Sequence, residues 1–200
     1  MQAHVPDAAA AILDLGCASG ALGAALKRRQ DACVVGIEID EAYAGDAAAR
    51  LDRVIVGGVA EVLERGELEG ERFDCVVAAD VLEHLVEPWM ALERAVGLLG
   101  PGGRVVVSLP NARSLELFVN VGLRGSWPRR DQGLFDRTHL RWFTLADGRR
   151  LMEGAGLEIE RVESRYFFEG WRLRVARLLG RTPLGAFLTG QYILVGRRRS

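Results

Sequence analysis

The sequence predicts an α/β fold in which a parallel β-sheet is covered on both faces by helices. Two observations point to this class. Short apolar runs rich in β-branched residues recur along the first half of the chain, and segments with apolar residues at helical spacing separate them. The 200 residues, 49% of them hydrophobic, are enough for a complete core. We therefore expect one domain that spans residues 1–200.

The first half of the chain predicts strands and helices in strict alternation. The apolar runs predict strands at 10–16, 32–39, 53–57, 73–80 and 103–110. The segments between them predict helices at Leu22–Gln30, Ala42–Arg50, Val59–Glu64 and Pro88–Leu99. The last helix has proline near its start and glycine then proline after its end, which is typical of helix boundaries.

The pattern becomes less regular after Pro110. A helix is predicted over Ser114–Leu123, followed by a loop rich in Gly, Pro, Arg and aromatic residues that is too long for a plain linker. The remaining predicted elements are a helix capped by Thr144, a strand over 157–166, a basic amphipathic helix over Trp171–Leu179 and a strand over 191–198. We expect 111–142 and 166–190 to be insertions on the substrate side of the domain.

The composition predicts a soluble, cytoplasmic protein. No run approaches 18 consecutive apolar residues, and the first residues lack the features of a secretory signal. Cys17, Cys33 and Cys75 stand singly in apolar segments, without the paired spacing of a zinc site. We expect all three to be reduced and mostly buried.

The net charge of −1 conceals an asymmetry along the chain. Residues 1–120 carry 10 Lys and Arg against 19 Asp and Glu, a balance of −9, whereas residues 121–200 carry 16 against 8, a balance of +8. This is either a solvated surface or a sign that the basic part faces an anionic substrate, a lipid surface or a partner. The Trp171–Leu179 helix suits the core of the domain, a partner or peripheral membrane contact.

The stretch "ILDLGCASGALG" joins the first predicted strand to the first predicted helix. Its turn places backbone N–H groups and a helix N-terminus at the carboxyl end of the sheet, where such folds bind ligands. The glycines fall at Gly16, Gly20 and Gly23, which does not match the G-x-G-x-x-G of a pyrophosphate cradle. Glu38 ends the next strand, where an acid can bind ribose hydroxyls. The pattern predicts a nucleoside ligand without a diphosphate, although the glycines could serve only the turn and Glu38 could be a solvated acid.

Three stretches of the chain resemble class I S-adenosylmethionine-dependent methyltransferases: "ILDLGCASGALG", "VVGIEID" and "FDCVVAADVLEHLVEPWMALERAVGLLGPGGRVVVSLPN". The resemblance covers residues 10–165, and "DRTHLRWFT" is similar to bacterial small-molecule methyltransferases, including MetW-like and ubiquinone-type relatives. It implies a Rossmann-like sheet of seven strands in the order 3-2-1-4-5-7-6, with the last strand antiparallel. It also implies S-adenosyl-L-methionine as cofactor and S-adenosyl-L-homocysteine as product. The implied acceptor is a small molecule, with a hydroxyl or carboxyl oxygen of an anionic metabolite, sugar or lipid precursor favoured.

The same resemblance assigns residues to the cofactor. Gly16 and Gly20 would approach the methionine part of the cofactor, and Asp14 would orient its ammonium group through water or backbone. Glu38 would bind the ribose hydroxyls, and Ile39 would pack against adenine. Ala79, at the end of the fourth strand, would offer its backbone carbonyl to the ammonium group. The chain departs from the family pattern at Ala18 and Gly58, which replace a glycine and an adenine-binding acid, so we expect backbone groups near Gly58 to hold adenine. The assigned residues are Asp14, Gly16, Ala18, Gly20, Glu38, Ile39, Gly58, Val59 and Ala79.

Two histidines and the aromatic loop are the candidates for catalysis and substrate binding. A base is needed only if the acceptor is protonated at neutral pH, and His84 or His139 could serve as one. Arg137, Arg141 and Trp142 would suit a carboxylate, a phosphate or an acidic sugar. Alternatively, His84 only starts a helix, and ion pairs tie the loop to the acidic half of the chain. "DVLEH" also resembles metal-binding text of ubiquinone-type enzymes, but we expect no metal.

Other functions remain as alternatives. The chain could bind cofactor as a regulatory partner of another enzyme without turnover, as MetW-like proteins are thought to do. Nucleic acid is disfavoured as acceptor because the fifth strand ends in "SLPN" and no Pro-Cys pair is present. A nicotinamide-dependent oxidoreductase is disfavoured by the glycine spacing. The first strand starts close to Met1, so the cover over the cofactor could be short or could come from a second subunit of a homodimer.

Overall fold

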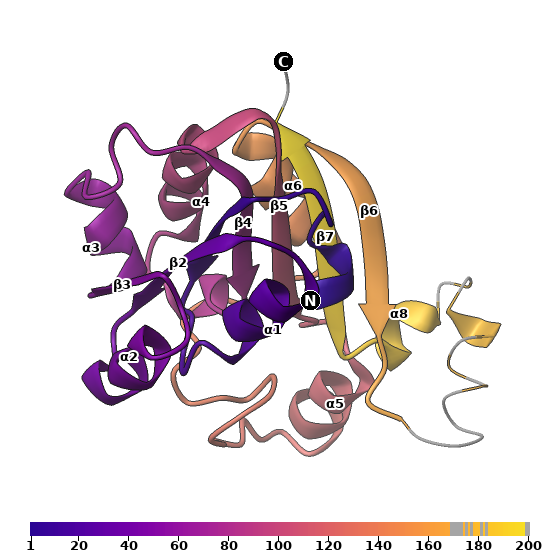
Figure 1. Ribbon diagram of the computed structural model, residues 1–200. Helices are drawn as coiled ribbons and strands as arrows, with labels where there is room; N and C mark the ends of the chain where they lie inside the picture. The colour runs from indigo at the N-terminus through magenta and orange to yellow at the C-terminus, as the bar shows by residue number, and fades with distance from the viewer. Residues whose placement is uncertain (169–173, 175, 177, 181, 183, 199–200) are drawn as a thin grey trace.

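The computed structural model describes residues 1–168, 174, 176, 178–180, 182 and 184–198. Its seven strands form one sheet in the order β3-β2-β1-β4-β5-β7-β6 (Figure 1). The strands are β1 (Ala11–Leu15), β2 (Cys33–Glu38), β3 (Arg53–Val56), β4 (Phe73–Ala79), β5 (Leu99–Pro110), β6 (Leu157–Arg165) and β7 (Gln191–Arg198). β1 to β5 pair in parallel, whereas β7 is antiparallel to β5 and β6. The predicted fold class and strand order are confirmed.

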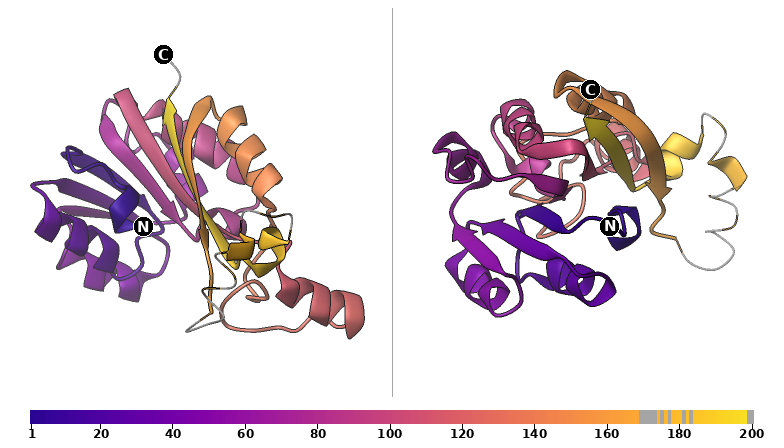
Figure 2. Two further views of the ribbon diagram at one scale, coloured as in Figure 1. Left: turned by 90° about the vertical axis from the view of Figure 1, so that its right-hand side faces the viewer. Right: turned by 45° about the horizontal axis from the view of Figure 1, so that its top comes forward.

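Helices cover both faces of the sheet, as Figure 2 shows. The helices of the first half are η1 (Gln2–His4), α1 (Ala21–Arg29), α2 (Glu41–Ala48), α3 (Val59–Glu64) and α4 (Pro88–Gly97), and α6 (Leu145–Gly154) follows later. Leu13 and Leu15 of β1 pack in the core with α3, α4 and α6, whereas Ile12 packs with residues of α1 and α2. Because neighbouring strand residues point to opposite faces, strands buried on both sides must be apolar throughout.

Local sequence explains where several helices begin. The Thr144 side chain accepts from Asp147 N, and the Asp147 carboxylate accepts from Thr144 N, which is a capping box at the start of α6. Asp40 caps α2 by accepting from Ala42 N and Tyr43 N. The predicted cap at Thr144 is confirmed.

The structure differs from the predicted elements in two places. β5 begins at Leu99 rather than 103, because Phe73 already pairs with Leu99 before a shift of register that makes Cys75 pair with Arg104. The predicted helix over Ser114–Leu123 is divided into α5 (Leu115–Leu117) and η3 (Phe118–Leu123), a π-helical segment. The predicted Trp171–Leu179 helix falls largely outside the described residues.

The segments after β5 gather at the carboxyl end of the parallel strands. Figure 1 shows α5 beneath the arrowheads of β4 and β5, with α8 (Gly185–Leu188) beside the end of β6. β7 starts at this same end of the sheet because it runs in the opposite direction. Within the part of the chain that is described, no helix is long and apolar enough to cross a bilayer.

Candidate functional site

The turn between β1 and α1 is built from left-handed residues. Gly16, Ala18 and Gly20 have φ values of +66°, +46° and +75°. A Cβ on Gly16 would lie 2.8 Å from Val81 Cγ2, and one on Gly20 would lie 3.0 Å from Ala47 Cα. Both glycines are therefore required by the turn and by the chain's own packing. Ala18 adopts the same region with a Cβ, which costs about 1–2 kcal/mol.

Glu38 ties this turn to the end of β2. Its carboxylate is buried, with Oε2 accepting from Ala18 N at 2.8 Å and Oε1 accepting from Asp40 N at 2.9 Å. Each carboxylate oxygen has two lone pairs, so one on each remains for a ligand hydroxyl. The geometry is compatible with the expected contact to ribose, and it adds a structural role that the sequence did not reveal.

Asp14 lies in β1 beneath the turn, and its carboxylate is buried. No described residue hydrogen-bonds to its Oδ2 atom. Burial, and then the charge of Glu38, raises the pKa of Asp14 to about 7. A buried carboxylate without a partner is costly, and a cation at the turn would supply the missing partner. This orphaned oxygen fits the ammonium group of the expected cofactor.

The remaining cofactor candidates lie at neighbouring strand ends. Ile39 follows β2 with 73% of its surface exposed, as an apolar platform for a base would be. Gly58 precedes α3, and Gly57 N donates to Glu38 O at 2.8 Å, so the ends of β2 and β3 are joined. The Val59 side chain is buried, which leaves only its backbone for adenine. Ala79 is the last residue of β4 and is half-buried.

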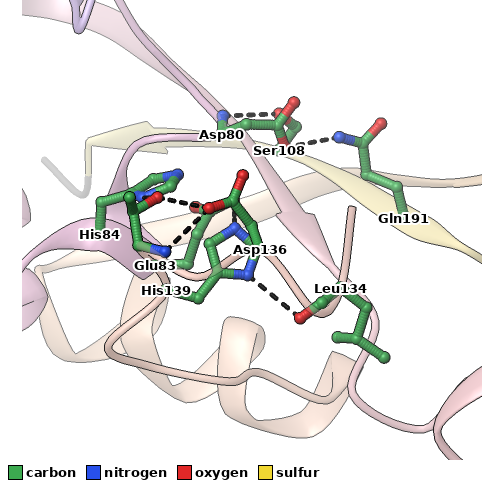
Figure 3. Close-up of polar contacts among 9 residues, drawn as sticks. Asp80, Glu83, His84, Ser108, Leu134, Asp136, His139 and Gln191 are labelled. Carbon is green, nitrogen blue, oxygen red and sulfur yellow. Dashed lines mark hydrogen bonds and ion pairs between the residues drawn. The ribbon is translucent and has the colours of Figure 1, made fainter. Parts of the chain in front are cut away.

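A second group of polar residues lines a cavity of about 480 Å³ at the ends of β4, β5 and β7. Figure 3 shows Asp80, Ser108 and Gln191 on one side of this group, with Glu83, His84, Asp136 and His139 on the other. Glu83 and His84 belong to η2 (Leu82–His84), the short helix after β4. The cavity is lined by Asp80, Glu83, His84, Pro110, Gln132, Gly133, Leu134, Asp136, His139, Arg165, Phe167, Gly190 and Gln191.

The two candidate histidines lie together at this cavity. Their ring centroids are 4.7 Å apart. His139 Nδ1 lies 3.3 Å from Leu134 O, and His139 Nε2 lies 3.9 Å from Glu83 Oε1 (Figure 3). His84 Nδ1 lies 2.9 Å from Thr138 Oγ1. The sequence-predicted pair is therefore brought together across 55 residues of chain.

Glu83 is buried behind the histidines. Only 1% of its surface is exposed, and neither carboxylate oxygen hydrogen-bonds to a described residue. Burial, and then the charge of Asp80, raises the pKa of Glu83 to about 8, while burial, and then His84, lowers the pKa of His139. Both shifts favour the neutral forms of the two groups.

Asp80 follows β4 with a φ of +51°, which is a strained conformation for a residue with a side chain. Asp80 N donates to Ser108 Oγ at 3.0 Å. The Asp80 carboxylate accepts from the Ser108 hydroxyl at 3.0 Å and from Gln191 Nε2 at 2.5 Å. Contacts from two strands, β5 and β7, therefore hold the Asp80 carboxylate at the cavity wall.

The predicted substrate residues Arg137, Arg141 and Trp142 are not among those that line the cavity. Arg141 Nη2 donates to Val86 O at 2.6 Å, which commits its guanidinium to the segment before α4. Arg137 pairs with an exposed aspartate, and Trp142 packs edge-on against another tryptophan at 5.2 Å. The arginine that does line this cavity is Arg165, at the end of β6.

The sequence analysis did not single out four polar residues that lie at this cavity or beside it: Asp136, Thr138, Ser108 and Gln191. Asp136 and Thr138 stand in the same "DRTH" as His139, so the local sequence could have indicated them. Gln191 and Ser108 carry no local signal, because only the pairing of β7 with β5 brings them to Asp80.

Glu83, His84 and His139 each offer one atom of a type that binds metals, and these atoms lie within 4.8 Å of one another. Nδ1 of each histidine already has a protein partner, so only the two Nε2 atoms are uncommitted to such bonds. The expectation that no metal is used stays a prediction.

Comparisons with known proteins agree with this geometry. A family described as "Methyltransferase domain" matches residues 3–162. The chain is 31% identical over 198 residues to a ubiquinone biosynthesis O-methyltransferase of Azorhizobium caulinodans, with 93% of this chain and 70% of that protein covered. Of two further curated relatives the chain spans 52% and 62% of the length.

Solved structures share the fold. A SAM-dependent methyltransferase from Archaeoglobus fulgidus matches with a TM-score of 0.69 at 17% identity, covering 96% of this chain and 87% of that one. Magnesium protoporphyrin IX methyltransferase from Synechocystis, crystallised with bound SAH, matches with a TM-score of 0.62 at 20% identity, covering 94% and 73%.

Proposed function

The chain belongs to the class I S-adenosylmethionine-dependent methyltransferases, and on that premise we propose that it transfers a methyl group to an oxygen of a small-molecule acceptor. The observation that carries this proposal is the polar cavity with His84 and His139, which opens at the end of β4 just beyond Ala79. A named O-methyltransferase among the relatives supports oxygen as the methylated atom.

The chemistry asks this chain mainly for positioning. The cofactor, when bound, supplies a methyl group already activated by its sulfonium. The cavity residues must then hold the acceptor oxygen in line with that methyl group and exclude water. If the acceptor is a hydroxyl, its proton must leave as the new bond forms, and an imidazole at the cavity is suited to accept it.

We assign the acceptor side to residues 111–142 and 166–190. A second cavity of about 480 Å³ is lined mainly by apolar residues of these segments, including Val119, Phe168 and Phe187. It shares Gly133, Leu134, Phe167 and Gly190 with the polar cavity. The two cavities together fit an acceptor whose reactive oxygen lies in the polar cavity and whose apolar part lies in the second cavity. Arg165, which lines the polar cavity, would suit an anionic group on the acceptor. Of the acceptor types that the sequence suggested, a lipid precursor is best matched.

The test begins with cofactor binding. Titration calorimetry should show that the wild type binds S-adenosylhomocysteine with micromolar affinity. The same measurement with NAD should show no binding. Ile39→Asp should weaken binding at least tenfold, about 1.4 kcal/mol, because a charge replaces the exposed apolar platform. Leu123→Asp is the matched control, since Leu123 is also exposed but lies in η3, and it should bind as the wild type does.

Turnover is measured next as production of S-adenosylhomocysteine with amphipathic hydroxyl acceptors. A folded protein that binds no sulfur nucleoside would overturn the proposal. Binding without turnover on any acceptor would favour the regulatory alternative instead.

A further inference from the structure

We propose that Asp136 and Thr138 hold the ring proton of His84 on Nδ1, so that His84 Nε2 is the atom that accepts the proton of the acceptor hydroxyl. Thr138 and Asp136 are then positioning residues that act through His84. The role of Nε2 rests on the proposed function, whereas the position of the ring proton does not.

The argument starts from the single proton of the Thr138 hydroxyl. Thr138 Oγ1 lies 2.6 Å from Asp136 Oδ1 and 2.9 Å from His84 Nδ1. Two oxygens at 2.6 Å must share a proton, because otherwise their lone pairs would repel each other. One of the two therefore donates this bond.

Asp136 is not the donor. Its Oδ1 already accepts from Thr138 N at 2.8 Å, as the oxygen of an ionised carboxylate does, and the ordinary pKa of aspartate lies well below neutral pH. Burial works to raise the pKa of Asp136, but the hydrogen bonds from Thr138 together with the nearby His139 and His84 lower it. The carboxylate is ionised and can only accept. Thr138 therefore donates its one proton to Asp136, and its oxygen faces His84 Nδ1 with a lone pair.

The position of the ring proton of His84 follows from this bond. A lone pair of Thr138 Oγ1 can be bonded by Nδ1 only if Nδ1 carries a proton. In the neutral ring this leaves Nε2 as the basic nitrogen. No described residue hydrogen-bonds to His84 Nε2, and His84 lines the polar cavity.

His139 is less suited to this task. Its Nδ1 must carry a proton because Leu134 O can only accept, and its Nε2 faces the buried carboxyl of Glu83 at 3.9 Å. Only 9% of His139 is exposed, whereas His84 is partly open. Of the two histidines, His84 is thus the one with a basic nitrogen free for an acceptor.

The proton and electron balance is complete without another reactant. The acceptor oxygen forms its bond to the methyl carbon as the carbon–sulfur bond breaks, and that electron pair stays on sulfur. The hydroxyl proton moves to His84 Nε2, and the resulting imidazolium keeps its Nδ1 bond to Thr138, with the charge of Asp136 behind it. Water then takes the proton after product leaves.

The test measures which ring nitrogen of each histidine carries the proton. The chain has three histidines, so long-range ¹H–¹⁵N spectra of protein labelled at histidine resolve each ring, with His4→Gln and His84→Gln for assignment. In spectra recorded at pH 8.5, His84 should show the Nδ1–H form. Thr138→Val and Asp136→Ala should each move most of the population to Nε2–H, because Asp136→Ala frees the Thr138 proton for Nδ1.

Two further variants separate this effect from lost stability. Thr138→Ser keeps the hydroxyl and should keep the Nδ1–H form. Thr144→Val removes another threonine-to-aspartate bond of 2.6 Å, at the start of α6, and should leave His84 unchanged. An Nε2–H ring in the wild type, or no change in folded Thr138→Val, would overturn the inference.

Activity provides the second readout once an acceptor turns over. Thr138→Val should lower kcat at least tenfold while the KM for S-adenosylmethionine stays within twofold, and Thr138→Ser should restore most of kcat. An unchanged kcat in folded Thr138→Val would overturn the role of Nε2. Absence of cofactor binding would instead refute the proposed function and leave the ring-proton assignment standing.

Discussion

Asp14 carries a buried carboxyl group beneath the turn between β1 and α1. Its carboxyl group is buried beside Glu38 and has an oxygen without a partner among the described residues. Burial, and then the neighbouring charge of Glu38, raises the pKa of Asp14 to about 7, because both disfavour its ionised form. A bound ammonium group would offset both effects by favouring the ionised form of Asp14.

Cofactor binding should therefore release protons. Between pH 5.5 and 7 the amino group of the ligand stays protonated. Before binding, Asp14 is largely protonated at pH 5.5 and about half protonated at pH 7, and after binding it is ionised. Calorimetry with S-adenosylhomocysteine in two buffers of different ionisation enthalpy should show close to one proton released near pH 5.5 and fewer as pH rises through 7. Asp14→Asn should release none and bind more weakly at pH 8. Equal release by both proteins would contradict this assignment.

Among the elements, the end of β5 depends on one amide side chain. Asn111 is fully buried, and its Nδ2 donates to Ala186 O at 2.7 Å and to Thr189 O at 2.8 Å. Its Oδ1 accepts from Arg113 N at 2.9 Å. These bonds attach α8 and the residue that follows it, Thr189, to the residue directly after β5.

Asn111→Ala should destabilise the fold by about 2–4 kcal/mol, because it leaves two buried carbonyls and an N–H without partners. The free energy of unfolding in urea measures this loss. Asn120→Ala is the control, since Asn120 is also buried but its Nδ2 bonds only Glu116 O one turn earlier. Asn120→Ala should lower the free energy of unfolding by about 1 kcal/mol. An equal decrease for the two variants would show that Asn111 does not join α8 to β5.

For the whole molecule, stability should depend on pH through its buried carboxyl groups. In folded protein the pKa values of Asp14 and Glu83 are raised to about 7 and about 8. The native state therefore binds more protons than the unfolded state between pH 4 and 8, and stability falls as pH rises through that range. The lowered pKa values of His4 and His139 act in the opposite direction, below the ordinary pKa of histidine.

Glu83→Gln should remove most of the decrease in folding stability that the wild type shows as pH rises. Between pH 6.5 and 8 the wild type should lose about 1.5 kcal/mol through Glu83, because its carboxyl must ionise without a partner. Glutamine has nearly the same shape and does not titrate. Urea unfolding at both pH values, at constant ionic strength, measures the difference, and parallel profiles for the two proteins would contradict the raised pKa.

Local patterns explain why so much of the fold could be predicted. The strands β1 to β4, the helices between them and the cap at Thr144 follow from apolar periodicity and from residues within a few positions of each boundary. The first residues of β5, around Gly100, have the sequence of a helix stop and form a strand only because Leu99 pairs with Phe73, so local sequence predicts a later start for β5. The strand order came from the family resemblance, since periodicity does not order strands.

The sequence by itself determined the α/β class, the position of the glycine-containing turn between β1 and α1, and the two histidines of interest, because each depends on residues close together in the chain. Only the tertiary structure decided that His84 and His139 meet, that Glu83 is buried behind them, and that Arg141 turns toward Val86 instead of the cavity. The reason is that side-chain direction, burial and proton sharing depend on contacts between segments far apart in sequence. Local sequence patterns do not specify such contacts.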